Sequence, residues 1–139
     1  MLRNVVRTTT MLIALVAVPI AAAAVSFAGT WHGVLAMNGQ RCTIDVVMAA
    51  NGSYVQTARC GTLMTQQSGA YKIANGEIGF SVVDWSPKQR YVVDAQVGSG
   101  HYETNAKPPG GMFKYTFTGP NTMVWRDVNF GGTITMQRG

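Results

Sequence analysis

Three Asn-Gly pairs, at 38–39, 51–52 and 75–76, constrain the fold of this chain more than any other feature. Asn and Gly both adopt the positive φ angles that tight hairpin turns require, so an Asn-Gly pair between two apolar stretches predicts a β-hairpin. Around these turns apolar and polar residues alternate with a period of two, and no stretch shows the periodicity of an amphipathic helix. The sequence therefore predicts an all-β fold.

The turn residues divide the chain into eight candidate strands. These are residues 27–37, 40–49, 53–61, 64–73, 77–85, 112–118, 122–128 and 132–138. Strands with one apolar face most simply close into an up-and-down antiparallel barrel, because closure removes the exposed sheet edges; a sandwich is the alternative. Residues 86–111 interrupt the pattern, and we expect them to form a long loop insertion with a short strand at 91–93.

The two cysteines provide a test of the strand registers. A three-residue loop at 50–52 places Cys42 directly opposite Cys60, whereas a two-residue turn there would place Cys42 opposite Gly61. At a non-hydrogen-bonded position such a pair lies close enough for a disulfide. We expect one structural disulfide that stabilises the fold by about 3 kcal/mol. A thioredoxin-like redox role is disfavoured because the chain has no Cys-x-x-Cys motif.

In the same registers the bulky apolar residues share one face, which would line the barrel interior. They are Trp31, Leu35, Ile44, Met48, Tyr54, Tyr71, Phe80, Phe113, Tyr115, Phe117, Trp125 and Met136. A barrel of this size either fills with side chains or holds one small ligand, and aromatic and Met-rich walls suit an apolar ligand. If the interior is hollow, the predicted ligand-binding residues are Trp31, Met48, Tyr54, Phe80, Tyr115 and Trp125. A packed core is the alternative.

The N-terminal segment differs from the rest of the chain. Arg3 and Arg7 precede an apolar run at 11–18 and a group of small residues at 21–24, which is the pattern of a secretory signal peptide. The run is shorter than the roughly 20 apolar residues of a membrane-spanning helix. We expect residues 1–24 to be a signal peptide, cleaved there or as late as residue 28, and residues 25–139 to form a single barrel domain. A periplasmic or secreted protein is consistent with a disulfide.

The residue types that catalysis requires form no recognisable motif. His32 is predicted on the outward face of the first strand and His101 in the 86–111 loop, and no Cys or carboxylate is spaced to join either as a metal ligand. The acidic residues are scattered, and neither a nucleophile elbow nor a phosphate-binding glycine motif occurs. The net charge of +5 includes no basic cluster, which argues against a nucleic-acid partner. We expect a non-enzymatic protein without a cofactor or metal.

Gly29-Thr30-Trp31, at the start of the first predicted strand, resembles the Gly-x-Trp motif of lipocalins and related calycin barrels. In that family the Trp closes one barrel end and a basic residue near the C-terminus packs over it. The resemblance implies this role for Arg138, with Arg126 as the second candidate. It also implies that the protein binds a small apolar molecule. The chain departs from the family in being shorter, in lacking a C-terminal helix and in carrying the 86–111 insertion.

A narrower resemblance rests on Gly29-x-Trp31, Cys42-Thr43-Ile44 and Cys60. These residues are similar to the small periplasmic inhibitors of bacterial metalloproteases, which are eight-stranded barrels with one early disulfide. In that family an N-terminal tail enters the protease active site, whereas here the tail would comprise residues 25–28 at most. The likeness implies the alternative function, a protein-binding barrel that inhibits an exported hydrolase such as a metalloprotease.

Overall fold

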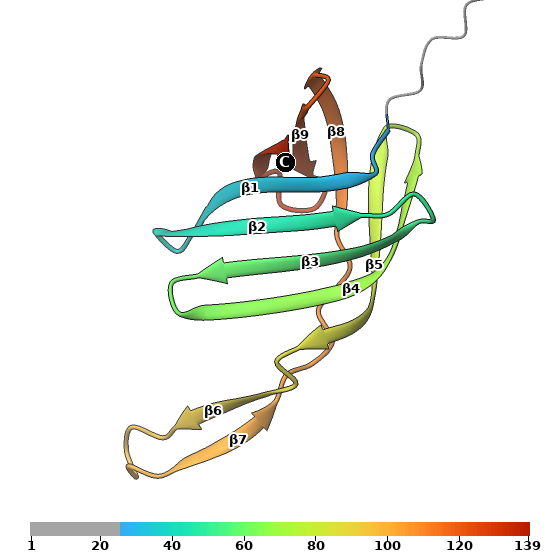
Figure 1. Ribbon diagram of the computed structural model, residues 1–139. Coiled ribbons are helices and arrows are strands. Elements are labelled where there is room, and N and C mark those ends of the chain that lie inside the picture. Colours follow the sequence, from blue (N-terminus) through green and yellow to red (C-terminus); the bar gives the residue numbers. More distant parts are fainter. Residues whose placement is uncertain (1–25) are drawn as a thin grey trace, which may run out of the picture.

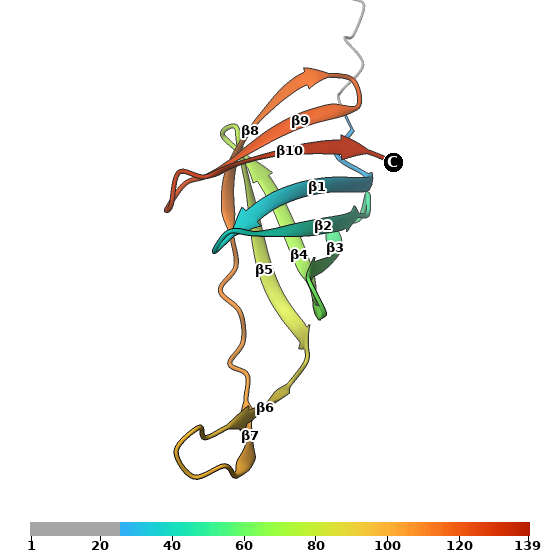
Figure 2. The ribbon, with the colours of Figure 1, turned by 90° about the vertical axis from the view of Figure 1, so that its left-hand side faces the viewer.

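The computed structural model describes residues 26–139, and the expected signal peptide lies outside the described residues. Its strands are β1 (Gly29–Met37), β2 (Gln40–Met48), β3 (Ser53–Cys60), β4 (Leu63–Ala74), β5 (Glu77–Ser86), β6 (Gln89–Val93), β7 (Gly100–Thr104), β8 (Met112–Gly119), β9 (Thr122–Asp127) and β10 (Thr133–Arg138). Eight of them pair in the order β1-β2-β3-β4-β5-β8-β9-β10, and β10 pairs back to β1 (Figures 1 and 2). The predicted closed antiparallel barrel is therefore confirmed.

The Asn-Gly pairs form the turns that the sequence predicts. In the turns at 38–39 and 75–76 all four residues have φ between 51° and 75°, the left-handed geometry of a two-residue hairpin turn. The 51–52 pair belongs to a three-residue loop, in which the Gly52 N–H donates to the Ala49 carbonyl at 3.1 Å and Gly52 has φ 88°. The Asn-Gly pairs thus form three of the four connections between β1 and β5.

The registers that place the two cysteines together are confirmed. Leu35 pairs with Cys42 and Met48 with Tyr54, and Cys42 pairs with Cys60. The two cysteines form a disulfide, with their Cα atoms 4.4 Å apart, the spacing of a non-hydrogen-bonded antiparallel pair. The disulfide therefore links β2 to β3 without altering the regular pairing of the two strands.

Inward-facing side chains form one contiguous core. Its buried members are Trp31, Val46, Met48, Tyr54, Ile78, Phe80, Met123, Trp125 and Met136. Their rings meet edge-on or tilted: the Tyr54 and Phe80 ring centroids lie 4.8 Å apart, and those of Phe80 and Trp125 lie 5.5 Å apart. Side chains thus occupy this part of the barrel interior.

One end of the barrel, where β1 begins and β10 ends, is closed. The Arg138 guanidinium lies 4.4 Å from the centroid of the Trp31 ring, and the Trp31 indole N–H donates to the Phe27 carbonyl at 2.9 Å. The Phe27 ring packs edge-on against Tyr115 and Phe117, with centroids 4.8 Å and 5.2 Å apart. The position implied for Arg138 by the Gly-x-Trp resemblance is confirmed.

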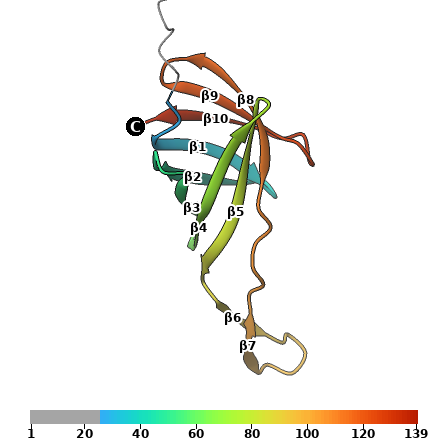
Figure 3. The same ribbon diagram turned by 90° about the vertical axis from the view of Figure 1, so that its right-hand side faces the viewer.

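Residues 86–111 form a two-stranded arm, not the long loop that the sequence predicts. β6 and β7 pair only with each other, and the arm projects from the end of the barrel at which β5 ends and β8 begins (Figures 1 and 3). β5 pairs with β8 over three residues at 77–79 and then leaves it, so the arm is inserted between two neighbouring barrel strands. The expected strand at 91–93 is the second half of β6. The prediction omits β7 because its sequence at 100–104 is short and mostly polar.

Candidate functional site

The six predicted ligand-binding residues are brought together, but they lie within or against the packed core. Trp31, Met48, Tyr54, Phe80 and Trp125 are each at most 5% exposed. Tyr115 is partly buried and packs against the same cluster beside Phe27. A ligand entering from solvent would therefore meet other residues first.

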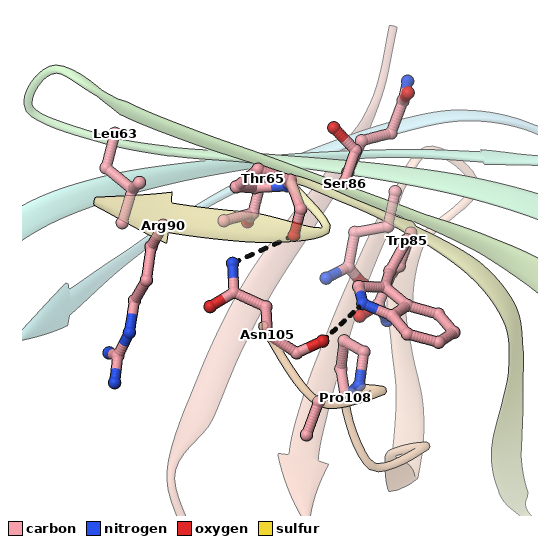
Figure 4. Close-up of a pocket in the computed structure, with 12 residues that line it drawn as sticks. Leu63, Thr65, Trp85, Ser86, Arg90, Asn105 and Pro108 are labelled. Atoms are coloured by element: carbon pink, nitrogen blue, oxygen red, sulfur yellow. Dashed lines mark hydrogen bonds between the residues drawn. The ribbon is translucent and has the colours of Figure 1, made fainter. Parts of the chain in front are cut away.

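The open end of the barrel carries a pocket of about 460 Å³, which we name the mouth pocket. Its barrel-side wall consists of Gln56, Leu63, Thr65, Gln66, Gln67, Trp85 and Ser86, and the base of the arm contributes Pro87, Arg90, Asn105, Ala106 and Pro108. Figure 4 shows Leu63 and Arg90 on one side of Asn105, and Trp85 and Pro108 on the other. The lining combines an aromatic ring with several neutral amides, a composition that differs from the apolar wall predicted from the sequence.

A β-bulge turns Trp85 into the mouth pocket. The pairing of β4 with β5 shifts between Ser68 and Gly69, which leaves Val83 as an extra residue without a partner. Beyond the bulge Trp85 pairs with Gln67, which is partly buried and lines the pocket, while Val83 is 73% exposed. Strict alternation from the buried residues of β5 would point Trp85 outward, so sequence reasoning missed it.

Two glutamines form the inner part of the pocket. Gln56 on β3 and Gln67 on β4 are directly opposite each other, and both are partly buried. The Gln67 side-chain amide donates to the Tyr54 hydroxyl at 3.4 Å. Burial raises the pKa of Tyr54 above its ordinary value, and the hydrogen bond from Gln67 opposes this rise. The phenol is therefore neutral at physiological pH. The register that pairs Val46 with Gln56 already places this glutamine on the inward face, a signal that sequence reasoning left unused.

Asn105 joins the base of the arm to the end of β5. Its carbonyl accepts a hydrogen bond from the Trp85 indole N–H at 3.2 Å, and its side-chain amide donates to the Pro87 carbonyl at 2.9 Å. The Asn105 backbone N–H donates to the Lys88 carbonyl at 2.8 Å, and the Lys88 ammonium lies 3.3 Å from the centroid of the Trp85 ring. These contacts fix the wall that the arm adds to the pocket.

A second polar cluster lies on the outer face of β1 and β2. His32 Nδ1 is 2.5 Å from Asp45 Oδ1, and Asp45 Oδ2 accepts a hydrogen bond from Arg59 at 3.2 Å. Sequence reasoning missed this contact, although the two-residue turn predicted at 38–39 places His32 opposite Asp45. Within residues 26–139 no hydroxyl group is hydrogen-bonded to His32, so the pair shows no activated nucleophile.

Across the described part of the chain, no group of three His, Cys, Asp or Glu side chains is placed to hold a metal ion. The same residues include no helix with the length and apolar character needed to cross a membrane. No protein-family model matches the chain, and no curated protein matches it in sequence. The architecture is an eight-stranded antiparallel barrel, which is consistent with a calycin-like fold.

Proposed function

We propose that this protein is an exported, non-enzymatic β-barrel that binds a small apolar molecule at the mouth pocket. The observation that carries the proposal is the difference between the two barrel ends. Phe27, Trp31 and Arg138 close one end, whereas the other end opens into about 460 Å³. Pockets of roughly 300–1,000 Å³ hold most small ligands of proteins. Leu63 and Trp85 would contribute apolar contact to such a ligand.

Export is supported by the Cys42–Cys60 disulfide, since disulfides persist in oxidising compartments. The expected signal peptide at residues 1–24 agrees with it. The ligand would then be encountered in the periplasm or outside the cell.

A binding role is favoured over catalysis by the chemistry of the mouth pocket. Its polar side chains are chiefly amides and hydroxyls, and an amide is neither a nucleophile nor a general base at neutral pH. His32 and Asp45 lie on the outer face of the barrel and do not line this pocket.

The test uses the protein without its signal peptide and the apolar fluorophore N-phenyl-1-naphthylamine. We expect saturable binding that a Trp85→Ala variant weakens at least tenfold, and that Leu63→Asp weakens without disturbing the Trp85 contacts. Phe130→Ala is the matched control, because Phe130 is 89% exposed and does not line the pocket. Absence of saturable binding, or equal affinities in all variants, would overturn the proposal.

The alternative is a barrel that binds and inhibits an exported hydrolase such as a metalloprotease. The arm favours it, because Tyr91 and Tyr102 pair across β6 and β7 yet remain 58% and 70% exposed. The tail implied by the inhibitor resemblance is not free to enter an active site, since Phe27 packs against Tyr115 and Phe117. Inhibition of the metalloproteases secreted by the source organism, lost in Tyr91→Ala, would support this alternative; full protease activity at micromolar protein would exclude it.

A further inference from the structure

We infer that the mouth pocket selects an uncharged amphiphile whose polar part is an amide or a hydroxyl-bearing group. The inference rests on the proposed function and specifies the chemical class of its ligand.

The lining of the mouth pocket offers both hydrogen-bond donors and hydrogen-bond acceptors. Gln56 and Gln67 face each other across β3 and β4, and Asn105 lies on the opposite wall. Each side-chain amide offers two donors and one acceptor. A carboxylate can only accept and an ammonium can only donate, so either would leave part of the amides unpaired when water is expelled, at a cost in binding. An amide or hydroxyl group both donates and accepts hydrogen bonds. It can therefore pair with the N–H groups and with the carbonyl oxygens of the two glutamines.

The charge of the mouth-pocket lining is already balanced. Among the residues that border the mouth pocket, Arg90 is the only charged side chain. Its guanidinium donates to Glu103 Oε2 at 3.1 Å, and Glu103 Oε1 lies 3.0 Å from His101 Nε2. The positive charge of Arg90 is thus already paired with a carboxylate on the arm. A charged ligand would lose hydration without gaining an unpaired counter-charge.

The floor of the mouth pocket is polar but uncharged. Gln67 donates to the Tyr54 hydroxyl, and Tyr54 is 2% exposed with its ring against Phe80. The inner end is therefore polar but neutral, and below it the core is aromatic. Leu63 is 58% exposed, and it supplies apolar surface nearer the rim together with Trp85 and Pro108. This arrangement suits a compact polar group at the glutamine pair and an apolar part toward the rim.

The experiment compares ligands that each carry a chain of eight carbon atoms, the carbonyl carbon included, and differ in the polar group. Octyl glucoside and octanamide are neutral, octanoate is an anion and octylammonium is a cation. Each ligand would be added, below its critical micelle concentration, to the protein without its signal peptide. The displacement of the bound fluorophore would be measured. We expect the neutral pair to bind at least tenfold more tightly than either ion, which corresponds to about 1.4 kcal/mol.

Two substitutions of one residue test the assignment to the glutamine pair. Gln67→Leu should lower the affinity for the neutral ligands about tenfold and leave the affinity for the ions unchanged. Gln67→Glu, which has nearly the same shape, should shift the preference toward octylammonium. Gln137→Leu is the control, because Gln137 is exposed on the outer face of β10.

Two outcomes separate the inference from the proposed function. If the ions bind as tightly as the neutral ligands and Trp85→Ala weakens all of them, the inference is wrong while the binding function stands. If no octyl compound binds and the fluorophore does not bind either, both are wrong.

Discussion

Arg138 covers the outer face of the Trp31 ring while its two terminal nitrogens bind the chain that precedes β1. Nη1 donates to the Ala28 carbonyl at 2.6 Å and Nη2 donates to the Ser26 carbonyl at 2.5 Å. The guanidinium lies 4.4 Å from the Trp31 ring centroid. One side chain near the C-terminus thus joins the first and last strands of the barrel at its closed end.

Replacement of Arg138 by Ala should lower the free energy of unfolding by about 2–3 kcal/mol, because it removes a cation–π contact and two charge-assisted hydrogen bonds. Urea denaturation monitored by Trp fluorescence measures the loss. Arg126→Ala is the control, since Arg126 is exposed on β9 and its replacement should change stability by less than about 0.5 kcal/mol. Equal stabilities of the two variants would contradict the role given to Arg138.

Phe27 should belong to the mature protein. Cleavage after Ala28 would remove its contacts with Tyr115 and Phe117 and the carbonyl that accepts the Trp31 indole N–H. We expect mass spectrometry of exported protein to show a chain that begins before Phe27. A recombinant chain that starts at Gly29 should unfold at a lower urea concentration than one that starts at Val25, with Phe27→Ala between them. A mature N-terminus at Gly29 would contradict this prediction.

Loss of the disulfide should destabilise the barrel without changing its topology. The disulfide closes a loop between Cys42 and Cys60, which are 18 residues apart, and so restricts the unfolded chain. Replacement of both cysteines by Ala should therefore lower the free energy of unfolding by about 3 kcal/mol. Denaturant unfolding of the oxidised protein and of the variant gives the difference. The far-UV circular dichroism spectra should remain alike, because the backbone pairs from Thr43–Arg59 to Met48–Tyr54 still join β2 to β3.

Stability should fall at alkaline pH through Tyr54. Burial raises its pKa in the folded state, so the folded protein keeps a proton that the unfolded chain releases above about pH 10. The free energy of unfolding should therefore decrease as the pH rises through the folded-state pKa. The decrease should be shallower in Tyr54→Phe, and Tyr102→Phe should behave as the parent does because Tyr102 is 70% exposed. Identical pH profiles for all three proteins would show that Tyr54 is not the group responsible.

Gly69 should be required for the shape of the mouth pocket. A Cβ atom at this position would lie 1.9 Å from the Ser81 carbonyl oxygen, so Gly69→Ala must push β4 and β5 apart beside the bulge. We expect the free energy of unfolding to fall by at least about 2 kcal/mol. Fluorophore binding should weaken as well, because Trp85 is displaced. Gly132→Ala is the matched control, because a Cβ there has no atom within 4 Å. Unchanged stability and fluorophore binding in Gly69→Ala would contradict the role of the bulge in shaping the mouth pocket.

Several elements of this fold follow from local sequence patterns. The turns at 38–39 and 75–76 depend on the residues that occupy them, and the period-two alternation of the flanking strands then sets which side chains face inward. Within a hairpin the register propagates along the ladder, so a three-residue loop at 50–52 is sufficient to place Cys42 opposite Cys60. The aromatic interior was predictable for the same reason.

The residues that line the mouth pocket could be identified only from the tertiary structure. One extra residue at Val83 reverses the inward and outward positions that follow it, and alternation carries no sign of such an insertion. The second wall comes from Asn105, which lies 20 residues beyond Trp85, and only the pairing of β6 with β7 returns it to the barrel.

The amino-acid sequence alone determined the eight barrel strands, their hairpin registers, the disulfide and the apolar face of the sheet, because each depends on residues within the same or the neighbouring hairpin. The tertiary structure decided which end of the barrel is closed and which side chains surround the open end. Those features depend on contacts between segments far apart in the chain, such as Phe27 with Tyr115, and packing alone selects such contacts.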